Sequence, residues 1–158
     1  MSLTLSSSAF RGNGPIPEEY TCDGANAAPP IQWRGVPSGT KTLALIVDDP
    51  DAPDPAAPKR TYVHWVVYDI PPNASGLTGD SLPSGAREGT NDRNETGYTG
   101  PCPPIGRHRY FFKLYALDTM IGNRGALTKA KLEEAMSGHV VEQAELIGTY
   151  ERAKVGAK

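Results

Sequence analysis

The sequence predicts a mainly β protein, and three observations lead to that prediction. The chain has 158 residues with 17 glycines and 15 prolines, about one residue in five, and both residue types interrupt helices and favour turns. Short apolar runs of strand length lie between these turn residues. One segment alone shows apolar residues at helical spacing. The length fits a single domain over residues 1–158.

Several segments have the pattern of strands. Short strands are expected at residues 3–5 and 31–33, each next to turn residues. The apolar run from Leu43 to Asp48 is the clearest strand, and the segments from Thr61 to Asp69 and from Arg109 to Leu117 follow it. In the second of these three, alternation predicts one face made of Tyr62, His64, Val66 and Tyr68, and an opposite face made of Val63, Trp65 and Val67.

One helix is expected from Thr128 to Ser137, near the C-terminus. Thr128 is suited to cap the first turn, and Gly138 suits the position after the last turn. The segment from Val140 to Tyr150 contains β-branched residues, and we interpret it as a last strand. The apolar face of the helix is formed by Leu132, Ala135 and Met136.

Two loops stand out between the strands. The segment from Pro50 to Arg60 contains four prolines, which prevent ladder pairing and restrict the backbone. Residues 71–106 show almost no periodicity and exceed the length of an ordinary connection, about 12 to 15 residues. Their last part, residues 97–104, combines tyrosine, glycine and proline, which favours an ordered loop of the kind that carries function.

Charge and hydropathy exclude two classes of partner. Lysine and arginine number 16 against 18 acidic residues, a formal net charge of −2, so nucleic acid is not an expected partner. The apolar runs are far too short to span a membrane, and residues 1–4 do not begin an export signal. Basic residues near Lys59 and Lys129 are too sparse for stable membrane association. A cytoplasmic protein is therefore expected.

The two cysteines, Cys22 and Cys102, form no C-x-x-C motif, which argues against a zinc knuckle or a redox pair. We interpret them first as small, partly buried thiols. A disulfide between them is the alternative, which ordinary cytosolic chemistry disfavours.

Three clusters carry side chains suited to chemistry. They are residues 48–51, with three carboxylates, His64 within a strand, and residues 108–110, with histidine, arginine and tyrosine. Each has a structural alternative, because a lone histidine on a half-buried strand is often a hydrogen-bonded core residue and Asp-Pro pairs commonly start turns. All three clusters border the two loops, where sheet proteins build pockets.

These clusters carry a resemblance to a known family. The motifs are Asp-Asp-Pro-Asp-Ala-Pro at 48–53, His-Trp-Val-Val at 64–67, Gly-Tyr-x-Gly-Pro-x-Pro-Pro at 97–104 and His-Arg-Tyr at 108–110. Together they resemble the phosphatidylethanolamine-binding protein family, also called the Raf kinase inhibitor protein family, and its bacterial and archaeal branch in particular. The sequence departs from that pattern at Arg93 and Asn94, where the family has an aromatic residue and a glycine, and in a short link over residues 104–108.

The resemblance implies an antiparallel β-sandwich with one or two short helices near the C-terminus and a small anion-binding pocket. Histidine N–H groups, the tyrosine hydroxyl and backbone N–H groups would be the donors, so anion affinity is expected to fall as the histidines lose their protons. Carried over by motif, the pocket consists of Asp49, Asp51, His64, Pro103, Pro104, His108 and Tyr110.

The function that this resemblance implies is non-enzymatic. We expect a binding or regulatory protein for a small phosphorylated or carboxylate ligand, with a kinase or serine protease as a protein target, a homodimer as the quaternary state, and no cofactor or metal. The alternative is a hydrolase or metal-dependent enzyme that uses Asp49, Asp51, His64 and His108 as an acid/base pair or as metal ligands. No nucleophile-elbow, H-E-x-x-H or phosphate-loop motif supports that alternative.

Overall fold

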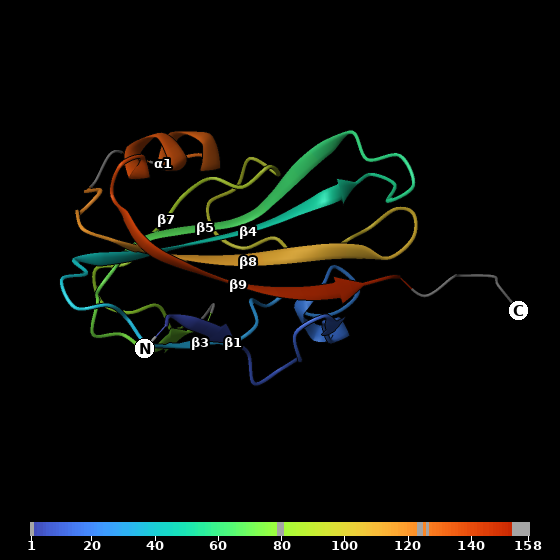
Figure 1. The fold of residues 1–158 in the computed structure, drawn as a ribbon. Helices are drawn as coiled ribbons and strands as arrows, with labels where there is room; N and C mark the ends of the chain where they lie inside the picture. Colours follow the sequence, from blue (N-terminus) through green and yellow to red (C-terminus); the bar gives the residue numbers. More distant parts are fainter. Residues whose placement is uncertain (1, 79–80, 123–124, 126, 153–158) are drawn as a thin grey trace, which may run out of the picture.

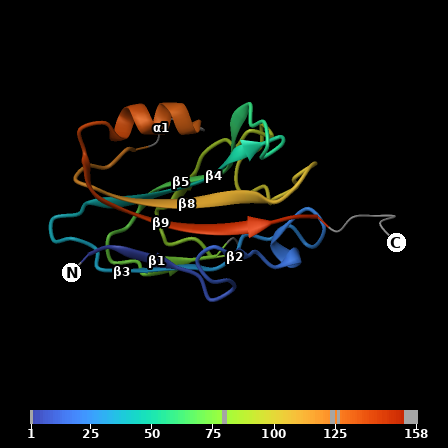
Figure 2. The same cartoon turned by 45° about the vertical axis from the view of Figure 1, so that its right-hand side comes forward.

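The computed structural model describes residues 2–78, 81–122, 125 and 127–152, which form three layers. A six-stranded sheet lies between a single helix, α1 (Lys129–Met136), and a three-stranded sheet (Figures 1 and 2). The prediction of a mainly β fold is confirmed.

The large sheet has the strand order β2-β9-β8-β4-β5-β7. Its pairs are antiparallel except for β2 with β9, which run parallel, so the sheet is mixed and the expected all-antiparallel sandwich is wrong in that detail. The four long strands match the three segments with clear strand patterns and the segment from Val140 to Tyr150. The expected absence of ladder pairing from Pro50 to Arg60 is wrong at its ends, because β4 continues to Ala52, which pairs with Arg60. In chain order the strands are β2 (Gly14–Pro15), β4 (Thr42–Ala52), β5 (Arg60–Ile70), β7 (Arg87–Glu88), β8 (His108–Leu117) and β9 (Val140–Tyr150).

The small sheet has the order β1-β3-β6 and packs against one face of the large sheet. Its strands are β1 (Thr4–Ser6), β3 (Ile31–Arg34) and β6 (Gly76–Leu77). The main core lies between the two sheets and includes Leu5 and Trp33 from the small sheet with Leu45, Trp65 and Phe112 from the large one. Burial of these large apolar side chains accounts for the pairing of the two layers.

Helix α1 covers the opposite face of the large sheet. The Thr128 hydroxyl accepts a hydrogen bond from the Lys131 N–H at 3.3 Å, and Gly138 adopts a φ of 82°, so both predicted ends of the helix are confirmed. Leu132 and Met136 are buried in a second core with residues of β4 and β5. A 3-10 turn, Glu18–Tyr20, lies near the N-terminus, where no helical turn was expected.

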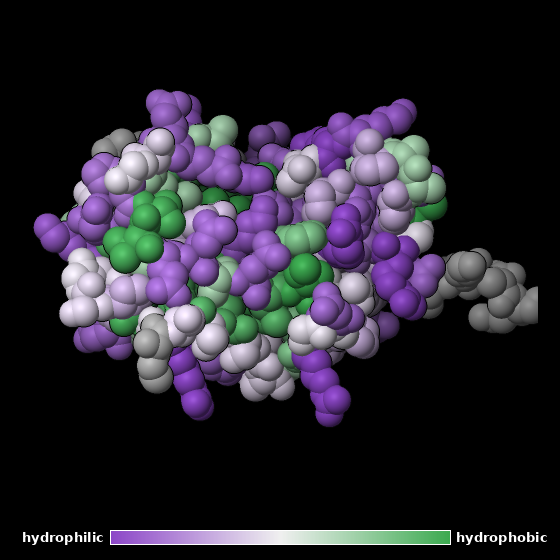
Figure 3. Space-filling model, viewed as in Figure 1, coloured by the Kyte–Doolittle hydropathy of each residue, from purple (hydrophilic) through white to green (hydrophobic). Residues whose placement is uncertain are grey.

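The surface face seen in Figure 3 is largely polar, with apolar side chains in separate patches. Across the described residues, the large apolar side chains that are exposed are Ile105, Met120, Val140 and Val141. In the described part of the chain, no helix has both the length and the apolar character to cross a membrane.

Candidate binding pocket

A cavity of about 330 Å³ lies where β4 ends and where β5 and β8 begin. The loops after β4 and before β8 close its sides, so residues from both Pro/Gly-rich segments meet there. Six of the seven residues predicted from the sequence line it, and the exception is Asp51. The six are Asp49, His64, Pro103, Pro104, His108 and Tyr110.

A β-bulge in β5 determines which way His64 faces. Val47 pairs with Trp65 and Asp48 pairs with Val63, which leaves His64 as an extra residue between two paired positions. Val63 consequently packs in the core beneath α1, whereas Trp65 packs between the sheets. The predicted grouping of Val63 with Trp65 is therefore wrong, because strict alternation breaks at the bulge. His64 contacts Tyr110 and so lies on the same face as Trp65.

His64 is 4% exposed and has one of its two ring nitrogens occupied. Its Nδ1 lies 2.7 Å from the Thr99 carbonyl oxygen, which only accepts, so Nδ1 must carry the proton. Burial lowers the pKa of His64 to about 4, although the hydrogen bond to Thr99 acts in the opposite direction. At neutral pH the ring is therefore neutral, and Nε2 is an acceptor without a partner in the described part of the chain.

Tyr110, on β8, supplies a donor to the same cavity. Its ring meets the His64 ring edge-on with centroids 5.2 Å apart, and its hydroxyl has no hydrogen-bond partner within the described residues. Every fully buried side-chain nitrogen or oxygen of those residues has a partner, so this hydroxyl and His64 Nε2 both reach the open cavity. Burial raises the pKa of Tyr110 far above its ordinary value, so the phenol stays neutral and donates.

His108 lines the cavity but has both ring nitrogens engaged. Nδ1 lies 2.5 Å from Asp49 Oδ2, and Nε2 lies 3.0 Å from the Pro53 oxygen and 2.9 Å from the Ile105 oxygen. Asp49 is engaged as well, since its Oδ1 accepts the Asp51 N–H at 2.7 Å. Burial raises the pKa of the Asp49 carboxyl, while the hydrogen bond from His108 opposes that effect. The pair holds both loops in place, and the predicted role of His108 as an anion donor is wrong.

Asp51 faces away from the cavity. Its carboxylate accepts two hydrogen bonds from the Arg109 guanidinium, at 2.9 and 2.8 Å, and a third from the Arg109 backbone N–H. These hydrogen bonds lower the pKa of Asp51. The motif that suggested Asp51 as a site residue therefore contains one pocket residue, Asp49, and one residue that fixes the start of β8.

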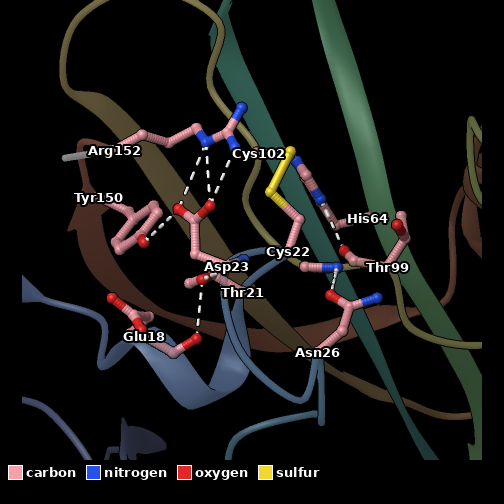
Figure 4. The surroundings of a disulfide bond; sticks show 11 residues. Glu18, Thr21, Cys22, Asp23, Asn26, His64, Thr99, Cys102, Tyr150 and Arg152 are labelled. Atoms are coloured by element: carbon pink, nitrogen blue, oxygen red, sulfur yellow. Dashed lines mark hydrogen bonds and ion pairs between the residues drawn. A yellow bond between two sulfur atoms is a disulfide. The ribbon is translucent and has the colours of Figure 1, made fainter. Parts of the chain in front are cut away.

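A disulfide holds the loop that forms one wall of the cavity, residues 99–104. Cys22 and Cys102 are joined, with Cα atoms 5.4 Å apart, so our first interpretation of them as thiols is wrong (Figure 4). The Cys22 N–H donates to the Pro101 oxygen, and the Gly100 N–H donates to Asn26 Oδ1. A side chain at Gly100 would lie 2.4 Å from that same oxygen, which explains the glycine. The pairing was open from sequence because the cysteines are 80 residues apart.

The sequence analysis missed the cavity's cationic residues. Arg60 and Tyr62 precede His64 on the same strand, and the Arg60 guanidinium lies 5.1 Å from the centre of the Tyr62 ring. Arg93 also lines the cavity, at the position where the sequence departs from the family pattern. Asn94 adopts a φ of 62°, so it takes the left-handed conformation that glycine favours, and the turn is kept. Strand alternation placed Tyr62 on the same face as His64. Arg93 was noted only as a departure from the family pattern, and nothing in the sequence indicated that it lines the cavity.

The cavity therefore combines a neutral donor, a neutral acceptor and two guanidinium groups. Guanidinium groups attract oxyanions, and each of these two also has a carboxylate beside it. Arg60 lies 3.0 Å from Asp92, and Arg93 lies 3.9 Å from Glu95. The described residues hold no group of three or more histidine, cysteine or acidic side chains placed to bind one metal ion. The arrangement suits a small oxyanion held by hydrogen bonds.

Comparison with known proteins identifies the family of the chain. A family model described as phosphatidylethanolamine-binding protein matches residues 6–151. A UPF0098 protein of Methanothermobacter thermautotrophicus is 48% identical over 155 residues, which cover 95% of this chain and 99% of that protein.

Solved structures show the same fold. A phosphatidylethanolamine-binding protein homologue from Chlamydia trachomatis has a TM-score of 0.89 and 42% identity, with coverage of 96% of this chain and 99% of that chain. E. coli YbcL has a TM-score of 0.86 and 31% identity, with coverage of 97% and 100%. A carboxypeptidase Y inhibitor complexed with its cognate proteinase shares the fold, with a TM-score of 0.59, 23% identity, and coverage of 96% of this chain and 84% of that chain.

Proposed function

The chain belongs to the phosphatidylethanolamine-binding protein family, and we propose that it is a binding protein whose cavity holds a small phosphoryl or carboxylate group. The observation that carries this proposal is the unpartnered Tyr110 hydroxyl inside the cavity. A donor that faces an open cavity and has no protein partner can donate to a ligand oxygen there without losing an existing protein hydrogen bond. The nearby arginines, Arg60 and Arg93, favour a ligand with negative charge.

An NMR titration tests the proposal. Wild-type protein is titrated with inorganic phosphate, phosphorylethanolamine, phosphotyrosine and acetate, and dissociation constants are taken from the shifts of cavity residues. Tyr110→Phe removes the hydroxyl without emptying the site, and we expect affinity to fall about tenfold or more, since a hydrogen bond to a charged group contributes about 1.5 to 3 kcal/mol.

Tyr115→Phe is the matched control, because Tyr115 lies on the same strand and packs against the core beneath α1. Its affinities should equal those of the wild type. If none of the four ligands shifts cavity residues at millimolar concentration, the proposed function is wrong.

An enzymatic role has less support from the same side chains. Asp51 is bound to Arg109, and Asp49 is bound to His108. His64 is the one member of the proposed acid/base set with a ring nitrogen that lacks a partner in the described part of the chain. An acid/base pair needs two groups that both reach the substrate.

A protein target is a second proposal, and the carboxypeptidase Y inhibitor supports it as a fold neighbour solved with its proteinase. Residual activity of serine carboxypeptidases, other serine proteases and a kinase panel at increasing protein concentration tests it. Inhibition that phosphate relieves would link the target to the cavity, whereas full activity throughout would reject this role.

A further inference from the structure

The two polar atoms that face the cavity have opposite hydrogen-bonding character. The Thr99 carbonyl holds the His64 proton on Nδ1, so Nε2 offers a lone pair. The Tyr110 hydroxyl, with its ring edge-on to His64, offers a proton. A fully ionised oxyanion has only lone pairs, so it can satisfy the tyrosine but is repelled by Nε2.

We propose that the cavity selects an oxyanion that still carries one proton, whose O–H donates to His64 Nε2 while another of its oxygens accepts from Tyr110. The inference rests on the proposed anion-binding function and adds the protonation state of the ligand. The chemistry it describes is a singly protonated phosphoryl group, either free hydrogen phosphate or a phosphate monoester.

The charged groups around His64 do not cause its Nε2 to be protonated, so the proton between Nε2 and the ligand has to come from the ligand. Asp48 and Asp92 are carboxylates close enough to favour a charged ring, but Asp48 is held by Lys113 and Lys129, and Asp92 is held by Arg60. His64 contacts the Tyr62 and Tyr110 rings and the Thr99 backbone. The other titratable or charged groups that line the cavity with it are Asp49, Arg60, Arg93 and His108.

His108 does not replace His64 as the acceptor or the donor. Its Nε2 faces two backbone carbonyls and its Nδ1 faces Asp49, so no ring nitrogen is left for a ligand. The burial of His64 keeps its ring neutral down to a pH of about 4. If an anion required a protonated His64 ring at neutral pH, the free energy of protonating the ring would lower the affinity for that anion. A ligand that brings its own proton avoids that cost.

Phosphate and sulfate show whether the ligand must carry a proton, because the two anions share shape and size and differ in protonation. Inorganic phosphate retains a proton near neutral pH, and phosphate monoesters lose theirs with a pKa of about 6, whereas sulfate has none to give. Isothermal titration of the wild type with inorganic phosphate, sulfate and phosphorylethanolamine, at about pH 6 and about pH 8.5, gives the affinities. Buffers of different ionisation enthalpy give the number of protons taken up.

We expect sulfate to bind at least about tenfold more weakly than phosphate, because its oxygens oppose the Nε2 lone pair. Phosphorylethanolamine affinity should fall about tenfold for each pH unit above its pKa of about 6, with uptake of about one proton per anion bound at about pH 8.5. Inorganic phosphate keeps one proton at both pH values, so its binding should show neither effect. Tighter binding of phosphorylethanolamine than of inorganic phosphate would identify a headgroup as the ligand source, and the reverse order would identify free phosphate.

His64→Gln sharpens the test, because the glutamine amide can donate where Nε2 accepts. In that variant sulfate should bind as well as phosphate, and the proton uptake that accompanies phosphorylethanolamine binding at about pH 8.5 should disappear. His139→Gln is the control, since His139 is exposed, is paired with Asp118 and does not line the cavity. Equal affinities of wild-type protein for phosphate and sulfate, with no proton uptake when phosphorylethanolamine binds at about pH 8.5, would overturn this inference while leaving anion binding intact. No binding of either anion would overturn both.

Discussion

The cavity has two walls that are held in different ways. On one side, the loop of residues 99–104 is joined to the N-terminal part of the chain by the disulfide and by the Asn26 side chain (Figure 4). On the other side, the loops that contain Pro53 and Ile105 converge on His108, which is itself paired with Asp49.

The difference explains why two buried histidines in one cavity have different roles. His108 uses both nitrogens to hold its wall, so none remains for a ligand. The other wall is covalently held, and His64 gives it a single hydrogen bond through Nδ1. Its second nitrogen is consequently available. A histidine that lines a pocket is a ligand contact only when the structure around it is held by other means.

The largest expected effect is loss of the disulfide. Because the bond closes a loop between residues 80 apart, Cys22→Ser with Cys102→Ser should lower the free energy of unfolding by about 4 kcal/mol. Urea denaturation checks this, and a dithiol reductant should lower wild-type stability by a similar amount. The reductant should leave the double variant unchanged. If the double variant keeps wild-type stability and phosphate affinity, the covalent wall does not support the cavity.

The next effect is on the His108 wall. His108→Gln leaves Asp49 without its buried hydrogen-bond partner and removes the ring nitrogen that lies between the Pro53 and Ile105 oxygens, so we expect the free energy of unfolding to fall by about 3 kcal/mol in urea denaturation. His64→Gln should cost only about 1 kcal/mol, because His64 makes one side-chain hydrogen bond, to the Thr99 oxygen, and is not paired with a carboxylate. If the two variants lose equal free energy of unfolding, His108 does not stabilise its wall more than His64 stabilises the other wall.

The last effect is the pH dependence of stability at His64, which appears only below about pH 6.5. Its pKa is about 4 when folded and about 6.5 when unfolded, so the unfolded chain binds the proton more tightly. The stability from the neutral ring is full above about pH 6.5 and is lost towards pH 4, with a slope of about 1.4 kcal/mol per pH unit. Urea denaturation of the wild type and His64→Gln between these values should show the slope reduced by that amount in the variant. His139→Gln should retain the wild-type slope.

Local pattern was enough to predict most of the fold. The four long strands and helix α1 were predicted because each has a period or a cap that is readable within some ten residues. The parallel pairing of β2 with β9 was not predictable, since two residues, Gly14 and Pro15, carry no periodic signal. The bulge at His64 was also missed, because it arises from register with β4 and not from the sequence of β5.

The sequence by itself identified part of the cavity lining, without its arginines. Its motifs brought forward six of the lining residues, and their chemistry limited the site to polar recognition of a small group. Only the tertiary structure decided what each residue does. The contacts that decide these roles are made with distant segments or with backbone carbonyls, and neither kind of contact can be predicted from the local sequence. This holds for Asp51, His64, His108 and Cys102. The hydrogen-bonding capacity that remains for a ligand is what those partners leave unused, so it is a property of the folded chain.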